Sequence, residues 1–420
     1  MALATIVLVV EGVTFVGPLS SGALWLLLPA RHVSTDHDQV APQPPRHKGG
    51  IDLGTGLYIR NDEDLIVPGT PALVLRRTYL SGYRVSRELG VGTTHNGELY
   101  LVGDPDRFQW IAVILPDGSR ITFERVSPGT SYLNAMFEHH ASPSEWQGAR
   151  LGWIGTGWAL RRTDGTLMRF RACVGSGPLC SIVEERDSEG HVVSYRRDAA
   201  GQLSRIEAAQ NRWIAFDYDM QKRIARAHDS TGNEVRYQYD SRGRLSRVTA
   251  KDGTERRYGY SERDEMATIS DPGIRIENAF DRDGRCTRQV NYISGSKEPY
   301  TFDFSYLVKN GAVVQTDSTE SDGTWNRLIY GPNHYVESIS WAHVGIQPVV
   351  STYERNPVTN AVIAVVVSCF DEKGRPTRQA SSVRDGNEAW VEWFLVSRNC
   401  AAGVVDRGDA ANRSLQVVGV

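Results

Sequence analysis

Apolar and polar residues alternate in short runs through the middle of the chain, and polar turn sequences separate these runs. In VRYQYD (235–240) every second residue is apolar or aromatic, the chain turns at Ser-Arg-Gly (241–243), and RLSRVTA (244–250) leads back. Alternation with a period of two is typical of strands that bury one face. Short runs joined by Asp- and Gly-containing turns predict antiparallel hairpins.

The hairpins recur at a fixed spacing. Aspartates that follow an aromatic-rich strand lie 21 residues apart at Asp198, Asp219 and Asp240, Ser261 takes the next place, and Asp281 follows 20 residues later. Glycine stands three positions after the aspartate, at Gly201, Gly243 and Gly284, with Lys222 and Asp264 in the other two copies. An apolar or soft residue follows two positions later, at Leu203, Ile224, Leu245, Met266 and Cys286. A constant period over this many units predicts a repeat architecture.

The turn chemistry and the strand composition indicate an all-β fold. Asp before a turn bonds backbone amides two residues on, and Gly243 is expected to have a positive φ because only 241–243 join the flanking strands. A second set of turns lies between the aspartates, as in DSTG (229–232) and KDG (251–253). We therefore expect successive hairpins of one twisted, spiralling sheet, in which Tyr237 and Tyr258 stack from repeat to repeat.

Composition excludes several classes of protein. The chain has 420 residues, 40% of them hydrophobic and 23% charged, which rules out an intrinsically disordered chain, a collagen-like fibre and a multi-span membrane protein. A net charge of −3 gives no indication of nucleic-acid binding. The 40 glycines and 17 tyrosines suit tight turns between aromatic-rich strands.

The N-terminus is apolar and leaves two interpretations open. Residues 2–30 carry one charge, Glu11, and a polar stretch that ends in a linker, APQPPRHKGG (41–50), follows them. One interpretation is a membrane anchor or export-related segment, with a helix from Gly12 to Ala30. The other is a start codon placed too far upstream, or an apolar arm that does not span a membrane. The chain is accordingly expected in the cell envelope or secreted, and in the cytoplasm before export.

The repeats resemble a known family. The pattern Y-x-Y-D-x-x-G-R-L at 237–245 looks like the YD repeat of Rhs proteins, and CFDEKGRPTRQ (369–379) resembles a further copy, with Asp371 and Gly374. DGTWNRLIYGPNHYVESI (322–339) resembles a degenerate one, and 52–82 is similar to the β-rich domain that precedes the repeats in bacterial Rhs proteins. The expected structural repeat positions are Tyr195, Asp198, Gly201, Leu203, Asp219, Tyr237, Tyr239, Asp240, Gly243, Leu245, Tyr258, Asp281, Gly284, Asp371 and Gly374.

Together, period and resemblance predict five regions. They are an apolar segment and linker (1–47), a β-rich domain (48–175), the YD repeats (185–290), degenerate YD-like repeats (291–385) and a divergent tail (386–420). We expect this ribbon to be too short to close a cavity and to end in a free, apolar strand edge near AVIAVVVSCF (361–370).

The resemblance implies a structural function without enzymatic activity. Rhs proteins coil their repeats into a shell, and in bacterial members the shell encloses a C-terminal toxin that is often delivered by type VI secretion. The implied partners are a toxin domain or a downstream Rhs segment, together with a secretion apparatus. No toxin domain and no core-ending autoproteolytic motif is recognisable, so we expect an N-terminal fragment, an orphan or a frameshifted remnant. The alternative is a cell-envelope module that binds carbohydrate through exposed aromatics such as Trp153 and Trp158, or Trp390 and Trp393.

Candidate chemistry is sparse. His139 and His140, followed by Ser142 and Ser144, have no nucleophile-elbow context and are interpreted as a solvated loop. The chain has no C-x-x-C, no histidine at zinc-ligand spacing from a cysteine and no calcium-loop motif, so the sequence predicts no catalytic, cofactor-binding or metal-binding residues.

Five cysteines are too few for a disulfide framework in a chain of this length. Cys173 and Cys180 bracket a short loop, and they are either a disulfide in an oxidising compartment or two inert buried thiols.

Overall fold

The computed structural model describes residues 5–10, 13–18, 49–104, 107–172, 180–344, 346–370, 376–384, 390–395, 402–405 and 416–419. The chain divides into two compact units, one comprising residues 33–300 and the other residues 1–32 together with 301–420. The described residues form strands, turns and one short 3-10 helix, η2 (Tyr132–Asn134), which confirms the predicted all-β class.

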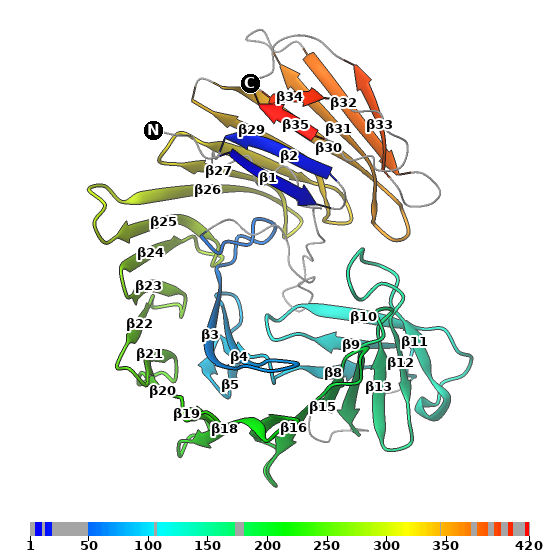
Figure 1. Cartoon of the computed structure of the whole chain (residues 1–420), viewed down its shortest axis with the longest axis vertical. Coiled ribbons are helices and arrows are strands. Elements are labelled where there is room, and N and C mark those ends of the chain that lie inside the picture. The colour runs from blue at the N-terminus through cyan, green and yellow to red at the C-terminus, as the bar shows by residue number, and fades with distance from the viewer. Residues whose placement is uncertain are drawn as a thin grey trace. The chain divides into compact units, whose positions relative to one another are not determined.

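The first unit begins with a small antiparallel sheet. It contains β3 (Ile59–Val67), β4 (Leu73–Leu80) and β7 (Thr93–His95), and the two-residue strands β5 (Ser86–Arg87) and β6 (Gly90–Val91) pair beside it. Contacts of β3 and β4 with β17 (Leu203–Ala208), β18 (Arg212–Tyr218), β19 (Ile224–Asp229) and β20 (Glu234–Tyr239) place this sheet against the repeats (Figure 1).

A closed barrel follows the small sheet. Its strands are β8 (Tyr100–Gly103), β9 (Trp110–Ile114), β10 (Arg120–Arg125), β11 (Met136–Glu138), β12 (Arg150–Trp153), β13 (Gly157–Arg161), β14 (Leu167–Arg171) and β15 (Cys180–Arg186). Each strand pairs antiparallel with the next, and β15 closes the ring by pairing with β8. Large buried side chains such as Phe123, Phe137, Trp158 and Phe170 form its core.

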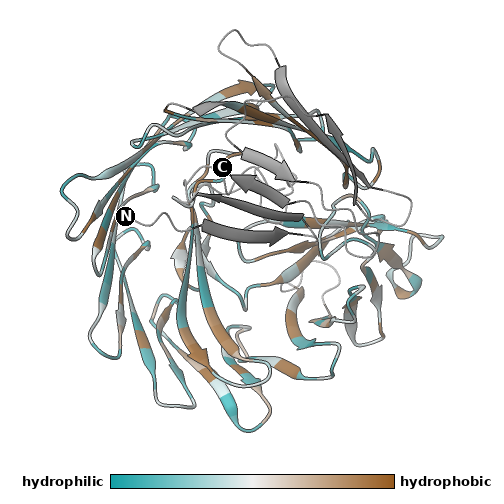
Figure 2. Cartoon of the chain, turned by 45° about the horizontal axis from the view of Figure 1, so that its top comes forward, coloured by the Kyte–Doolittle hydropathy of each residue, from teal (hydrophilic) through white to brown (hydrophobic). Residues whose placement is uncertain are grey.

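The repeat hairpins continue directly from β15. The strands are β16 (Val192–Arg197), β17 (Leu203–Ala208), β18 (Arg212–Tyr218), β19 (Ile224–Asp229), β20 (Glu234–Tyr239), β21 (Leu245–Ala250), β22 (Glu255–Tyr260), β23 (Met266–Asp271), β24 (Ile274–Phe280) and β25 (Cys286–Ile293). Every consecutive pair is antiparallel, as the alternation predicts. Figure 2 shows apolar and polar residues alternating along these strands.

One cross-strand pair forms the core of each hairpin. The pairs are Tyr195–Ile206, Phe216–Ala227, Tyr237–Val248 and Tyr258–Ile269, and all eight side chains are buried. Directly opposed aromatic and aliphatic side chains of this kind stabilise antiparallel sheets. In the last repeat of this unit the buried polar pair Asn278–Gln289 takes the same place. Its side chains bond each other, since Gln289 Nε2 donates to Asn278 Oδ1 over 2.9 Å.

The second unit contains a further run of antiparallel strands. They are β26 (Tyr300–Lys309), β27 (Ala312–Glu320), β28 (Trp325–Tyr330), β29 (Val336–His343), β30 (Ile346–Arg355), β31 (Val362–Phe370), β32 (Pro376–Arg384) and β33 (Trp390–Leu395). The expected free edge at 361–370 is wrong, because β31 pairs with β30 on one side and β32 on the other. β33, within the region predicted as a divergent tail, then pairs with β32.

The N-terminal apolar segment also differs from its predicted helix. β1 (Thr5–Val10) and β2 (Val13–Pro18) pair with each other, and β2 pairs in parallel with β35 (Gln416–Gly419), which pairs with β34 (Ala402–Val405). The remainder of the segment, 19–30, lies outside the described residues. Among the residues that the structure describes, there is no helix with the length and apolar character needed to cross a membrane.

Of the two states left open for Cys180, a disulfide or an inert thiol, the structure has the disulfide. Cys180 and Cys369 are each disulfide-bonded, whereas Cys286 is a free, buried thiol whose pKa burial raises to about 12. Cys173 and Cys400 lie outside the described residues.

The position three residues after each turn aspartate has the predicted left-handed backbone, with φ of +79° at Gly243 and +63° at Lys222. We expect Gly243→Val to lower the free energy of unfolding by about 1–3 kcal/mol, because a β-branched residue is strained at positive φ. The matched change Lys222→Gly should raise it by about 0.5–1 kcal/mol. Urea denaturation of both variants measures this, and a neutral Gly243→Val would contradict the role assigned to the turn.

Candidate functional site

The repeat turn is a small hydrogen-bonded unit centred on its aspartate. Asp240 Oδ1 accepts the backbone N–H groups of Arg242 and Arg244, at 2.9 and 3.0 Å, and Oδ2 pairs with the Arg244 guanidinium at 2.6 Å. The backbone carbonyl of Asp240 accepts the N–H of Gly243 over 3.0 Å. Asp219 and Asp281 make the same pairs of backbone contacts. Although partial burial opposes ionisation, the Arg244 hydrogen bonds hold the pKa of Asp240 below its usual range.

A β-bulge follows every repeat turn. Between β20 and β21, Tyr239 pairs with Leu245 and Gln238 with Arg247, so that Ser246 is left unpaired. The same shift occurs between β18 and β19, β22 and β23, and β24 and β25. A bulge interrupts the ladder, and the backbone groups of the residue beside it then need other partners.

The next repeat supplies a hydrogen-bond donor for the backbone carbonyl of the apolar residue at each bulge. The phenol hydroxyl of Tyr218 donates to the carbonyl of Leu203 over 2.8 Å, Tyr239 donates to Ile224 over 2.6 Å, and Tyr260 donates to Leu245 over 2.7 Å. Phe280 takes the tyrosine position in the last repeat of this unit and has no hydroxyl. There the side-chain amide of Asn278 donates to the Met266 carbonyl over 3.0 Å instead.

The arginine of each turn reinforces this link between repeats. Arg223, paired with its own Asp219, lies over the ring of Tyr239 at 4.2 Å from the centroid. Arg244 lies over Tyr260 in the same way, at 4.7 Å. A guanidinium over an aromatic face adds a cation–π attraction. The Tyr, Asp and Arg of the motif are therefore parts of one interlock between neighbouring repeats.

The segment before the barrel supplies partners for the amides of the same bulge residues. The N–H of Ile224 donates to the carbonyl of Glu88 over 2.7 Å, and the N–H of Met266 donates to the Tyr79 hydroxyl over 2.8 Å. Leu203 N donates to the Glu88 carboxylate over 3.2 Å, and Cys286 N to the Gly56 carbonyl over 2.8 Å. The small sheet and its loops thus pair with the repeats at regular intervals.

A buried charge network fixes the small sheet against the repeats. Arg77, 1% exposed, pairs with Asp64 at 2.9 Å and with Asp62 at 3.1 Å. The Tyr237 hydroxyl donates to Asp64 over 2.8 Å, and Arg77 donates to the hydroxyl of Tyr258 over 3.1 Å. Burial opposes ionisation of Asp62, but Arg77 and Arg60 hold its pKa below the usual range.

The structure places the sequence-predicted repeat positions as follows. Tyr195, Tyr237 and Tyr258 are buried in the hairpin core, and Leu203 and Leu245 are fully buried at the bulges. Tyr239 makes the link between repeats, and the turn positions Asp198, Asp219, Asp240, Asp281, Gly201, Gly243 and Gly284 occupy equivalent places in their hairpins. Asp371 and Gly374 lie outside the described residues.

His139 is buried, which contradicts its interpretation as part of a solvated loop. Its Nδ1 donates to the Thr122 carbonyl over 2.6 Å, and its Nε2 accepts from the Ser142 hydroxyl, also over 2.6 Å. The Ser144 hydroxyl lies 3.0 Å from that of Ser142 and completes the chain of hydrogen bonds. Burial lowers the pKa of His139, so the ring is neutral at pH 7. Both ring nitrogens of His139 and both serine hydroxyls therefore have hydrogen-bond partners, which suits a structural role in the 138–149 loop.

The aromatic pair proposed for sugar stacking is mostly interior. Trp158 is 2% exposed, and Trp153 packs edge-on against it at 5.3 Å between ring centroids. Tyr132 contacts Trp153 at 5.1 Å. Trp158 therefore has no free face for a ligand. The side chains of Trp390 and Trp393 lie outside the part of the chain whose side chains are described.

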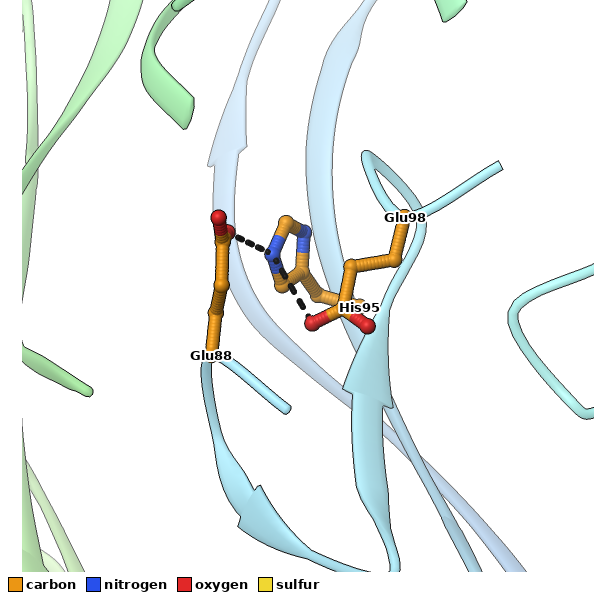
Figure 3. A group of neighbouring side chains, drawn as sticks. All are labelled: Glu88, His95 and Glu98. Carbon is orange, nitrogen blue, oxygen red and sulfur yellow. Dashed lines mark hydrogen bonds and ion pairs between the residues drawn. The ribbon is translucent and has the colours of Figure 1, made fainter. Parts of the chain in front are cut away.

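One group of titratable residues was missed by the sequence analysis. Glu88, His95 and Glu98 converge beside the first repeats (Figure 3). His95 Nε2 lies 2.9 Å from Glu88 Oε2 and 3.5 Å from Glu98 Oε1. Burial raises the pKa of Glu98 to about 7. A signal existed in the sequence, since three ligand-type side chains fall within ELGVGTTHNGE (88–98), but only histidines near cysteines were considered.

The charge network yields a stability prediction. We expect Arg77→Met to lower the free energy of unfolding by about 3–5 kcal/mol, because it leaves buried carboxylates without their counterion. The loss should be smaller when Asp64→Asn is already present, since that change removes one of the uncompensated charges. Chemical denaturation of the two single variants and the double variant measures the coupling. Equal losses in both backgrounds would show that Arg77 and Asp64 act independently.

The turn aspartates yield a pH prediction. The folded pKa of Asp219 and of Asp240 lies below the unfolded value of about 3.9, so the stability that these two residues contribute is present above that pH and is lost as the pH falls through the folded pKa. Asp240→Asn keeps the Oδ1 acceptor but loses the charge. Its melting temperature should be below wild type at pH 7, and the difference should shrink towards pH 3. A difference that is constant with pH would exclude an ionic contribution from Asp240.

Two families match parts of the sequence. Residues 48–123 match a family described as Domain of unknown function (DUF6531), and residues 218–255 and 239–273 match the RHS Repeat. No curated protein matches the chain.

Solved structures that contain TcdB2-TccC3 are also similar to this chain. A crystal structure of TcdB2-TccC3-Cdc42 has a TM-score of 0.35 and 12% identity, over 81% of this chain and 23% of that chain. A crystal structure of TcdB2-TccC3 has a TM-score of 0.34 and 11% identity, over 91% and 26% respectively. The chain spans about a quarter of the length of these structures. The chain therefore carries RHS (YD) repeats within the hairpins described above, preceded by a DUF6531 domain.

Proposed function

We propose that the chain is a non-enzymatic, structural segment of an Rhs-type shell that encloses or delivers a toxin in bacterial competition. The observation that carries the proposal is the interlock between repeats. Each repeat donates a tyrosine hydroxyl to the carbonyl that a bulge exposes in the repeat before it. Units that satisfy each other's backbone in this way form a continuous wall, which suits a container better than a catalytic pocket.

The environment of the titratable groups supports a structural role. Asp219, Asp240 and Asp281 use both carboxylate oxygens for turn amides and a neighbouring arginine. The histidine–serine chain at His139 is buried and internally satisfied. A nucleophile needs a base, an orienting group and oxyanion donors around a space for substrate. Ser142 as a whole residue is only 8% exposed, which leaves little access for a substrate.

The partners follow from the shell function. We infer that a toxin domain or a downstream Rhs segment associates with the repeats, and that a secretion apparatus exports the assembly. Carbohydrate binding in the cell envelope is the alternative, and the burial of Trp158 leaves the half-buried Trp153 as the more accessible member of that pair.

Co-expression with the polypeptide encoded immediately downstream tests the proposal. We expect the two chains to co-purify at equal stoichiometry, the downstream polypeptide to resist limited proteolysis, and the purified chain to show no hydrolase or nuclease activity. Failure of the two chains to associate would contradict the shell function. Glycan-array binding that Trp153→Ala abolishes and Trp158→Phe leaves unchanged would instead establish the carbohydrate-binding alternative.

A further inference from the structure

Three potential ligand atoms point towards one place beside the first repeats. Glu88 follows β5, His95 ends β7, and Glu98 lies in the turn after it (Figure 3). Glu88 Oε2, His95 Nε2 and Glu98 Oε1 lie within 4.8 Å of one another. His95 is fully buried, the Glu98 side chain is 8% exposed, and Phe216 of β18 stacks on the imidazole at 5.8 Å between ring centroids.

The opposite atom of each side chain is held by the backbone. Leu203 N–H donates to Glu88 Oε1 over 3.2 Å, and Gly97 N–H donates to His95 Nδ1 over 3.1 Å. The Glu98 carboxylate accepts a backbone hydrogen bond from Glu88. The contact of Leu203 with Glu88 is of the kind that orients metal ligands in proteins, whereas the Gly97 contact belongs to the ring form that carries its proton on Nε2. The arrangement therefore directs one carboxylate oxygen, one imidazole nitrogen and a second carboxylate oxygen at a shared point.

Glu98 Oε1 is the atom that indicates a missing ligand. It is buried and has no hydrogen-bond partner, although it faces His95 Nε2 at 3.5 Å. A buried carboxylate oxygen without a donor is costly. Zinc bonds of about 2.0–2.2 Å in tetrahedral geometry separate neighbouring ligand atoms by about 3.3–3.5 Å. The 3.5 Å between His95 Nε2 and Glu98 Oε1 matches this value, whereas the 2.9 Å between His95 Nε2 and Glu88 Oε2 is a hydrogen-bond distance that lengthens when a cation replaces the proton.

We propose that Glu88, His95 and Glu98 bind a divalent cation of the zinc class. One imidazole and two carboxylates match the donor set of this class, and the fourth position is open to water. The cation takes the place of the proton on His95 Nε2, and the neutral ring then carries its proton on Nδ1. Because a protonated Nδ1 cannot accept a hydrogen bond, the Gly97 N–H must turn away from it. Because Glu88 also bonds Leu203 and Ile224, the bound cation ties the 86–98 segment to the first two repeats. The site is independent of the shell function.

Metal titration of the tag-free, full-length chain tests the site. The probes are Zn²⁺, followed by the melting temperature and by metal analysis after dialysis, and Co²⁺, followed by its visible absorption. The test variant is Glu98→Gln, which preserves side-chain size. The matched control is Glu262→Gln, which changes an exposed glutamate on a repeat turn.

We expect the wild type and Glu262→Gln to bind one cation per chain, with the absorption of four-coordinate Co²⁺ and a raised melting temperature in Zn²⁺. Glu98→Gln should weaken binding by at least about tenfold and remove the Zn²⁺ effect. Absence of saturable binding by the wild type would overturn the proposal. Equal binding by both variants would overturn it too, because the cation would then lie elsewhere. If Glu98→Gln does not fold, Glu88→Gln decides between these outcomes.

Discussion

The bulge after each repeat turn sets the constraint on which the rest of this fold depends. It removes the ladder partners of one buried apolar residue per repeat, and an unsatisfied buried backbone group costs about 1–3 kcal/mol. The carbonyl of that residue accepts a hydrogen bond from the tyrosine hydroxyl of the next repeat, as the Leu245 carbonyl does from Tyr260. Its amide donates a hydrogen bond to the segment before the barrel, as the Ile224 N–H does to the Glu88 carbonyl. The repeats therefore depend on one another and on the small N-terminal sheet.

The docking of that sheet uses charges where apolar contacts would suffice for stability. Arg77, Asp62 and Asp64 are buried together, and desolvation offsets much of the attraction between them. Such a network fixes the position of the small sheet on the repeats, because a shift of the sheet along them would leave a buried charge unpaired. Tyr237 and Tyr258, from successive repeats, each contribute a hydroxyl to the network. The family's tyrosine thus serves two purposes, a core ring and a polar contact to the sheet.

Local sequence was sufficient for the hairpins, and insufficient for contacts between distant segments. The period of the aspartates predicts the strand order, the turns and the left-handed residue at Gly243, because these depend on neighbours within one hairpin. The burial of His139 was not predictable, because the Thr122 carbonyl that binds it lies 17 residues away on another strand. The free edge expected at 361–370 was wrong because β32 pairs with β31 and because β33, in the region predicted as a divergent tail, extends the sheet further.

The group formed by Glu88, His95 and Glu98 also depends on contacts between distant segments, which the sequence does not reveal. Its residues are close in sequence, but the contacts that orient them, such as the Leu203 amide on Glu88, span 115 residues. The role of the Asn278 amide is likewise seen only in the structure. It donates to the Met266 carbonyl in place of the tyrosine hydroxyl that Phe280 lacks. Sequence reasoning recognises a substitution within a repeat. The compensating contact becomes visible only when the strands are placed.

The unfolding free energy of Tyr239→Phe, compared with Phe280→Tyr, tests the interlock most directly. Removing the Tyr239 hydroxyl leaves the Ile224 carbonyl without its donor, and the account predicts a loss of about 1–3 kcal/mol. Adding a hydroxyl at position 280 should bring no gain, because Asn278 already occupies the Met266 carbonyl. A neutral Tyr239→Phe together with a stabilising Phe280→Tyr would contradict the account.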